Sequence, residues 1–455
     1  MSEVIRDPID VHVPPVFRTA VPRQQQREPL LIRESCDTVL RNRQLILARR
    51  QDVVVHTRGD RDRICALTKG CTEHRAKVKE LGPGRSHVSM KRGPRGQIKA
   101  ASQDYLPTLD GWRAVAIAMV LFAHVRLPGN ALQGIAAYGA LGVHLFFAIS
   151  GFLITNRLLE EEEVAGRVSL QSFYIRRAFR ILPAALTYLV ALCVIGFALD
   201  LIPITIGQIL SSALFFRNYW VEPAAQSWYT GHYWSLSVEE HFYLLWPGLL
   251  VALGKRRARW AVPLLACLFA AWRGLDSHYN WIAALNPGLK DLVGRTDYRM
   301  DGLLWGCAAA FLWDAREIRA KAWWAIAPLA AMALLLIFEP PGYVALLALL
   351  MPVPLVFAAA DPASWFGRLL EVRPVAWFGR LSYSVYLWQM LFLPAYGIPV
   401  SLGVVQRFPL NLAFVLLAAC GSYYLVERPL RRWGRRLAAR PAAEAQVAVL
   451  PVLPN

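Results

Sequence analysis

The sequence predicts an all-α fold, a polytopic membrane bundle of about ten transmembrane helices with a disordered N-terminal tail. Three observations lead to this prediction. Hydrophobic residues make up 56% of the 455-residue chain. They occur in long blocks separated by short, Arg-rich connections, as in bundles of membrane helices. The 16 Trp residues fit the same picture, because indole side chains collect at the boundary between membrane and water.

Residues 1–104 form the predicted tail. They lack sustained apolar periodicity and any signal-peptide core, and they hold 21 Lys and Arg residues against 12 Asp and Glu residues. Met90 begins a short basic stretch that is typical of a start before a first membrane span. One hypothesis is therefore that translation of the native protein starts there, which mass spectrometry of its N-terminus would test.

The apolar blocks after this tail define the expected spans. A simple span needs about 20 residues, so the shorter blocks must be extended by flanking residues or shielded by neighbours. The apolar stretch 203–216 is shorter still, and we expect it to be re-entrant or interfacial. The expected spans are 110–126, 138–156, 182–201, 232–252, 260–275, 301–314, 323–339, 343–360, 375–394 and 408–427.

The basic residues of the connections predict the direction of these spans. With the N-terminus inside, the inner connections and the C-terminal tail hold 21 Lys and Arg residues, and the outer connections hold seven. This asymmetry follows the positive-inside rule. We therefore expect both termini in the cytoplasm and the chain in the inner (plasma) membrane of a bacterium.

Composition also argues against several classes of function. The net charge of +18 lies half in the tail and otherwise mainly in the inner connections, which disfavours nucleic-acid binding. The seven Cys form no CxxC motif and are odd in number, so neither a metal site nor a disulfide framework is expected. The sequence shows no evident internal repeat, so a transporter built from inverted repeats gains no support.

Ionisable residues inside membrane spans are costly, so each is a candidate for function. In the first span, Arg113 and His124 are eleven residues apart, which puts them on nearly one face and about 16 Å apart along the helix. Asp110 lies three residues before Arg113. A single His on an apolar helix is often a satisfied core residue, but the Arg on the same stripe favours a catalytic pair.

The fourth span places two carboxylates, Glu239 and Glu240, about two turns inside an aromatic helix. At least one must face a polar cavity or be protonated. Ser235 and Tyr243 share a face with Glu239 at four residues on either side. A cavity on the outer side that contains His124 and Glu239 would provide a general base and its orienting carboxylate.

Three further groups are ambiguous. A cluster of Arg in the connection before the third span suits phosphates of a nucleotide-bearing cofactor, although topology or lipid contact also explains it. Arg299 and Asp301 could bind substrate or form a surface ion pair. In the second span we expect a structural role for His144 and helix packing from Ser150 and Gly151. A covalent nucleophile at Ser150 is the less favoured alternative, because no nucleophile elbow surrounds it. The cluster comprises Arg176, Arg177 and Arg180.

The order of motifs resembles a known family. LDGWRAVAIAMVLFAHV, GVHLFFAISGFLIT, FYIRRAFRILPA, HYWSLSVEEHFYLLWP, YRMDGLLWG, LSYSVYLWQ and VERP follow one another. Together they resemble membrane-bound acyltransferase family 3, whose members O-acylate lipopolysaccharide O-antigens, exopolysaccharides, Nod factors and some antibiotics. The resemblance implies an acyltransferase-like membrane domain at 105–433, between the tail 1–104 and a short cytoplasmic tail 434–455.

The resemblance also implies roles for matching residues. The family's Arg–His signature corresponds to Arg113 and His124, and its WSLxxE motif to Trp234–Glu239. Its RRxxR motif, implicated in acyl-CoA binding, corresponds to the Arg cluster at 176–180. Two positions depart from the pattern: Gln389 stands where relatives commonly have His, and Trp112 where Leu is more usual. The hydrolase-like C-terminal domain of some relatives is not expected here.

The expected function is O-acylation of a cell-surface or exported carbohydrate or glycolipid. Acyl-CoA, most simply acetyl-CoA, is the expected co-substrate, and no permanently bound cofactor or metal is expected. His124 is expected to take the proton from the acceptor hydroxyl, with Glu239 orienting and Arg113 beside the pantetheine arm. A transporter with an intramembrane proton relay and a membrane scaffold are the alternatives. The candidate substrate-binding residues are Asp110, Ser235, Glu240, Tyr243, Arg299 and Asp301.

Overall fold

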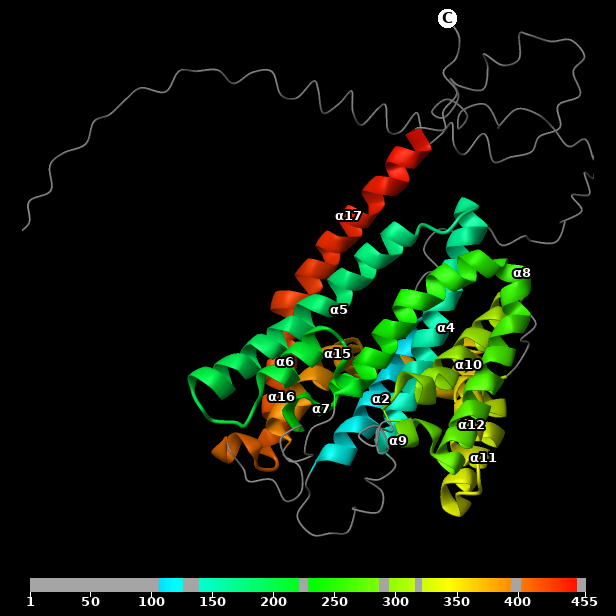
Figure 1. Ribbon diagram of the computed structural model, residues 1–455. Helices are drawn as coiled ribbons and strands as arrows, with labels where there is room; N and C mark the ends of the chain where they lie inside the picture. The colour runs from blue at the N-terminus through cyan, green and yellow to red at the C-terminus, as the bar shows by residue number, and fades with distance from the viewer. Residues whose placement is uncertain are drawn as a thin grey trace, which may run out of the picture. The chain divides into compact units, whose positions relative to one another are not determined.

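The computed structural model describes residues 106–125, 139–220, 228–285, 294–315, 321–393 and 402–447. Every regular element in these ranges is helical, and none of them contains a strand, which confirms the predicted all-α class (Figure 1). The tail predicted at 1–104 and the start hypothesised at Met90 lie outside the described residues.

The α-helices are distributed along the whole described region. Short 3₁₀ and π-helical turns join several of them, among them η3 (Val194–Ala198), η6 (Ala322–Ala325) and η8 (Ser422–Glu427). The α-helices are α2 (Pro107–His124), α4 (Ala140–Ala165), α5 (Leu170–Cys193), α6 (Ile206–Ala213), α7 (Trp228–Gly231), α8 (Tyr233–Tyr279), α9 (Trp281–Leu285), α10 (Thr296–Asp314), α11 (Ile326–Phe338), α12 (Tyr343–Leu350), α13 (Pro352–Ala360), α14 (Trp365–Glu371), α15 (Arg373–Phe392), α16 (Leu410–Gly421) and α17 (Arg428–Val447).

Local sequence signals explain where several of these helices begin. Pro107 starts α2, where its missing N–H and fixed φ suit the first turn. The Ser169 hydroxyl caps α5 by accepting the Ser172 N–H, and Ser364 caps α14 in the same way. In α6, Thr205 and Gln208 form a reciprocal capping box, so this eight-residue helix is a defined element within the stretch expected to be re-entrant or interfacial.

Four described helical segments are long and apolar enough to cross a membrane, and 323–338 is a shorter apolar helix. The other expected spans fall on α2, α8, α10 and α15, which are long enough but too polar or too highly charged to qualify by composition. The predicted count of ten spans is therefore not established by these criteria. The four segments are Leu141–Ala165, Leu170–Ala198, Tyr343–Ala360 and Leu410–Ala439.

The helix α8 joins two expected spans. We expected a connection between 252 and 260, but the chain stays helical on both sides of one kink at Gly254. Gly254 has φ 69° and ψ 157°, a conformation that only glycine adopts without strain. The basic residues expected in a loop therefore lie on the helix that follows the kink.

Glycines bring the central helices into backbone contact. A Cβ on Gly151 of α4 would stand 1.9 Å from the Leu303 carbonyl oxygen of α10, and one on Gly306 of α10 would stand 2.3 Å from the Ala148 carbonyl oxygen. Between α15 and α2, a Cβ on Gly379 would stand 1.8 Å from the Asp110 carbonyl oxygen. Small residues allow such close approach in membrane bundles, so the packing role predicted for Gly151 is confirmed.

The helices α2 and α4 run antiparallel with a fixed register. Gly139, which caps α4, lies against Ala123, and Gly142 lies against Ala116 three residues into α4. Ser150 is eleven residues beyond Gly139, or about 16 Å further along the axis at 1.5 Å per residue. Ser150 therefore lies near the level of Arg113, at the opposite end of α2 from His124.

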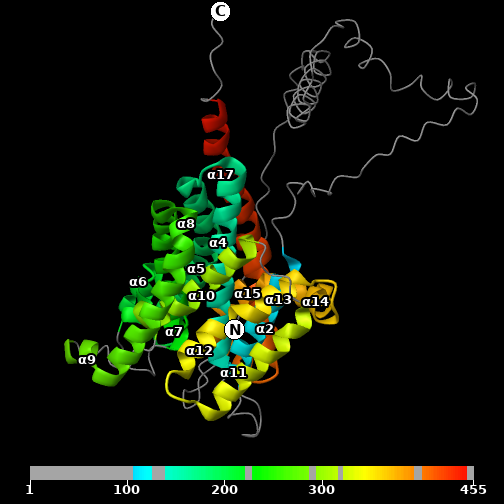
Figure 2. The ribbon, with the colours of Figure 1, turned by 90° about the vertical axis from the view of Figure 1, so that its right-hand side faces the viewer.

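The remaining helices surround this centre. Figure 2 shows α6 and α9 on one side of the bundle and α13 and α14 on the other. The helix α17 runs beside α5 (Figure 1), and it is helical as far as Val447, well into the expected tail. Glu427, which belongs to the VERP motif, is buried and accepts hydrogen bonds from Ser384 and Arg431.

Candidate active site

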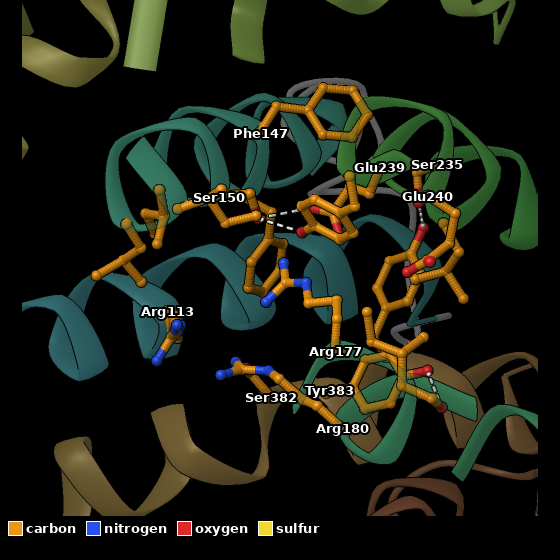
Figure 3. Close-up of a pocket in the computed structure, with 18 of the residues that line it drawn as sticks. Arg113, Phe147, Ser150, Arg177, Arg180, Ser235, Glu239, Glu240, Ser382 and Tyr383 are labelled. Atoms are coloured by element: carbon orange, nitrogen blue, oxygen red, sulfur yellow. Dashed lines mark hydrogen bonds between the residues drawn. The ribbon is translucent and has the colours of Figure 1, made fainter. Parts of the chain in front are cut away.

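A polar pocket lies among α2, α4, α5, α8 and α15 (Figure 3). Its cavity volume is about 100 Å³. Its apolar lining comes mainly from α4, including Phe146 and Phe147. The polar lining consists of Arg113, Ser150, Arg157, Arg177, Arg180, Ser235, Glu239, Glu240, Tyr243, Ser382, Tyr383 and Tyr386.

A hydroxyl and a carboxylate meet in this pocket. The Ser150 hydroxyl donates to Glu239 Oε1 at 2.8 Å, and the Tyr243 hydroxyl donates to Ser150 Oγ at 3.1 Å (Figure 3). Ser150 comes from α4, whereas Glu239 and Tyr243 lie one helical turn apart on α8. Packing of α4 against α8 thus produces a chain of three polar groups in which the carboxylate is the final acceptor.

Cationic groups surround the same space. The Arg177 guanidinium lies 3.6 Å from the ring centroid of Tyr243, and its buried Nε has no hydrogen-bond partner. Within the described part of the chain, Arg180 forms no ion pair, and four further Arg residues are close enough to repel it. Such a group of like charges is unfavourable unless anionic groups lie among them, and Glu239 interacts electrostatically with both Arg177 and Arg180. The four are Arg113, Arg177, Arg431 and Arg157.

The first-span pair is divided between two places. Arg113 lines the pocket and forms an ion pair with buried Asp110 at 2.9 Å. Asp110 also lies 3.9 Å from Arg380 of α15. Asp110 is thus placed to orient Arg113, and it does not itself line the pocket.

His124 lies outside the pocket as the described residues define it. Its Nδ1 is 2.7 Å from the Val120 carbonyl oxygen, and its ring meets Trp228 edge-on at 5.7 Å. The expected cavity shared by His124 and Glu239 is therefore wrong for this structure. The reason is helix length: His124 ends α2, whereas Glu239 is six residues beyond the start of α8 and faces the Arg113 level.

Ser235 and Tyr386 lie on the pocket wall nearer to His124. Their hydroxyl oxygens are 2.6 Å apart, and both hydroxyls also contact the His232 carbonyl oxygen. The buried His232 ring packs against Tyr386 and interacts electrostatically with His124. These groups therefore line the route between the pocket and His124.

Comparison with known proteins identifies the family of this chain. The family model described as an acyltransferase domain, acyltransferase family 3, matches residues 106–427. The chain belongs to this family. It is therefore an integral membrane protein with an acyltransferase domain for groups other than aminoacyl groups.

Three curated relatives show the same similarity. The chain is 28% identical over 364 residues to the peptidoglycan O-acetyltransferase OatA of Listeria monocytogenes, covering 73% of this chain and 57% of the relative. It is 29% identical to a putative O-acetyltransferase of Staphylococcus aureus, covering 75% and 59%. It is also 29% identical to the putative peptidoglycan O-acetyltransferase YrhL of Bacillus subtilis, covering 75% and 57%. The chain thus spans a little over half the length of these relatives. No solved structure matches it.

The acyltransferase motif RRxxR is split by the fold. Arg177 and Arg180 face the pocket, but Arg176 lies on another face of α5, where it pairs with Glu161 at 2.9 Å and remains 40% exposed. Three residues apart on a helix is one shared face, whereas the adjacent position is turned by about 100°. Two of these three Arg residues, Arg177 and Arg180, therefore line the pocket.

The expected pair of Arg299 and Asp301 is also separated. Asp301 is buried and bonds Arg273 at 2.8 Å, whereas Arg299 donates to His144 Nε2 at 2.9 Å. The prediction of an exposed ion pair between the two is therefore wrong, because positions two apart on a helix point in nearly opposite directions. Both residues lie outside the pocket. The contact with Arg299 agrees with the structural role expected for His144.

The sequence interpretation missed several pocket residues. Arg157 was taken only as a topology signal, and Tyr386 was given no role although it lies in the LSYSVYLWQ motif. The departure at Gln389 is buried, and neither amide atom has a hydrogen-bond partner among the described residues. No group of three His, Cys, Asp or Glu side chains in the described region could hold a metal. The basic pocket suits an anion instead.

Proposed function

We propose that this protein is a membrane O-acyltransferase, most simply an O-acetyltransferase, that transfers the acyl group of acyl-CoA to a hydroxyl of a cell-wall carbohydrate. One observation carries the proposal. The pocket combines a cluster of Arg residues with a hydroxyl bonded to a carboxylate, which are the groups needed to hold a phosphorylated donor and to move a proton during acyl transfer.

The Arg cluster supports a CoA donor. Coenzyme A carries several phosphates, for which guanidinium groups are the preferred side-chain partners. Arg180, which forms no ion pair in the described region, would bind them with Arg157 and Arg431 at the rim. The pantetheine arm would then extend past Arg113 and place the thioester at the level of Ser150 and Glu239.

The far end of α2 supports the acceptor. His124 and Trp228 lie there, outside the pocket lining and about 16 Å along α2 from Arg113. We propose that this end opens to the outer side of the membrane and binds the carbohydrate, with both termini and the Arg cluster on the cytoplasmic side. The names of the relatives support peptidoglycan as the acceptor. Lipopolysaccharide, also expected from the sequence, has no such support.

Purified protein in nanodiscs tests this function. Acetyl-CoA and soluble peptidoglycan fragments should yield free CoA and fragments heavier by one acetyl group. In Arg180→Gln, the loss of a charged hydrogen bond of about 1.5–3 kcal/mol should raise KM for acetyl-CoA by about 10–100-fold. KM for acetyl-pantetheine, which lacks the phosphates, should stay unchanged.

Arg176→Gln is the matched control, because it removes an Arg of the same motif that faces away from the pocket. It should leave both KM values near those of the parent. Wild-type protein that transfers no acetyl group to any glycan fragment, but couples glycan or lipid movement to protons, would replace this proposal with the transporter alternative.

A further inference from the structure

The position of Ser150 suggests a covalent step in the reaction. We propose that Ser150 is the nucleophile that takes the acyl group from acyl-CoA and holds it as an ester until the carbohydrate hydroxyl arrives. This inference rests on the proposed function and adds a route to it. The sequence had favoured a packing role for Ser150, since no nucleophile elbow surrounds it.

Hydrogen bonding distinguishes Ser150 from the other hydroxyls of the pocket. Its own proton points to Glu239 at 2.8 Å, so the nucleophile and its base are already in contact. The Tyr243 hydroxyl donates to Ser150, and Tyr386 and Tyr383 donate to backbone carbonyls. Figure 3 shows Ser150 of α4 beside Glu239 of α8, joined by a dashed line. Ser150 is thus the hydroxyl best placed to lose its proton to a carboxylate.

The separation from His124 requires a local base. Ser150 lies about 16 Å along the bundle axis from the level of His124, far beyond hydrogen-bond reach. Proton transfer at the thioester therefore falls to Glu239. His124 is left to bind and orient the acceptor at the other end.

The chemistry balances with these groups alone. Ser150 Oγ attacks the acyl carbon as Glu239 takes the hydroxyl proton, and the carbon–sulfur bond breaks with its electron pair on sulfur. Glu239 then gives the proton to the thiolate, and CoA leaves as the free thiol. In the second step, the acceptor hydroxyl loses its proton to Glu239 and attacks the acyl-Ser150 ester. Ser150 leaves and regains a proton from Glu239.

A nearby positive charge and a nearby hydroxyl donor assist both steps. Arg177 lies over Tyr243, which itself contacts Ser150, so a positive charge and a hydroxyl donor flank the reacting oxygen. Both can stabilise negative charge that develops during attack. The site thus joins a nucleophile from α4, a base and a hydroxyl donor from α8 and a positive charge from α5.

Single-turnover experiments test the covalent step. Wild-type protein mixed with radiolabelled acetyl-CoA and no acceptor should release one equivalent of CoA in a burst, and the label should map to the peptide that contains Ser150. Ser150→Ala should lose the burst and the label. Ser150→Cys should carry a thioester, which neutral hydroxylamine cleaves and an oxygen ester resists.

Ser237→Ala is the matched control, because Ser237 is a buried Ser of α8 that bonds the Tyr233 carbonyl and does not line the pocket. It should keep the burst. Thermal unfolding of each variant shows whether it is folded. Label on Tyr243, a burst that persists in folded Ser150→Ala, or glycan acetylation by wild type with no burst would each overturn the inference while leaving the proposed function intact. Absence of any CoA release and any glycan acetylation by wild type would instead reject the proposed function.

Discussion

The contact between α4 and α10 allows a quantitative test of how packing controls the site. Gly151 is the residue after Ser150, and an Ala side chain there would meet the Leu303 carbonyl oxygen at 1.9 Å. Ordinary van der Waals contact begins at 3.4 Å, so the two helices must separate by about 1.5 Å. Both obstacles nearest the new methyl group are backbone atoms, which cannot rotate away. Gly151→Ala must therefore move α4 itself.

This movement has two measurable consequences. Overpacking of a well-packed interior costs about 1–3 kcal/mol, so the unfolding temperature of Gly151→Ala should fall. The shift of α4 also moves Ser150 relative to Glu239 on α8. A misplacement of about 1 Å can reduce catalysis by about 10²-fold, so activity should fall by at least that factor in protein that remains folded.

Gly248→Ala provides the control. It is the same substitution in α8, at a position where a Cβ meets nothing within 4 Å. Helix propensity alone should stabilise this variant by about 0.5–1 kcal/mol, and its activity should match the parent. Unfolding in detergent and acetyl transfer are measured for both variants. If Gly151→Ala equals Gly248→Ala in stability and in rate, then the close contact does not position Ser150 and the reasoning fails.

Three other predictions concern different parts of the bundle. His124→Ala should reduce acetyl transfer to glycan by about 10²-fold or more, because His124 lies at the acceptor end. The burst of CoA release should stay intact, and a lost burst in stopped-flow measurements would contradict this prediction. Burial of Asp276 tends to raise its pKa, but hydrogen bonds from Tyr298, the Ile282 N–H and Arg295 outweigh this and hold the pKa below 3.8. The carboxylate therefore stabilises the fold above pH 3.8 and loses this effect as pH falls through its lowered pKa. Asp276→Asn should lower the free energy of unfolding by about 1.5–3 kcal/mol at pH 7, and thermal scans should show a progressively smaller loss below pH 3.8. Glu427→Gln should lower stability by about 1–3 kcal/mol, since it weakens a buried acceptor of two hydrogen bonds; equal melting temperatures at pH 7 would disprove its structural role.

Much of the fold follows from features that are local in sequence. The apolar blocks predicted the helices, and the capping residues and Pro107 account for where several of them begin. The long helix through Gly254 was missed, because a basic segment with one glycine reads equally well as a loop or as a kinked helix. The number of spans also stays open. The helices α2, α8 and α15 carry the polar residues that line the pocket, and these residues lower the hydropathy by which a span is recognised.

The site was predictable by residue type more than by arrangement. Arg113 and Glu239 were singled out by the cost of charge in a membrane and Arg180 by its place in an Arg cluster suited to phosphates, and all three line the pocket. The partners of Asp301 and Ser150 could not be predicted, because they come from other helices whose register depends on glycine contacts. An intrahelical spacing gives the face of one helix and leaves the facing residue of its neighbour undetermined.

The register between α2 and α4 also changes the meaning of the Arg–His signature. From sequence, Arg113 and His124 form one catalytic stripe. In the bundle, the ten residues between them separate one end beside the Arg cluster from another end beside Trp228. A fixed rise of 1.5 Å per residue keeps these ends about 16 Å apart, and no side-chain movement can close that distance. In the proposed function, the donor occupies the first end and the acceptor the second, and the acyl group is held on Ser150 near the level of Arg113.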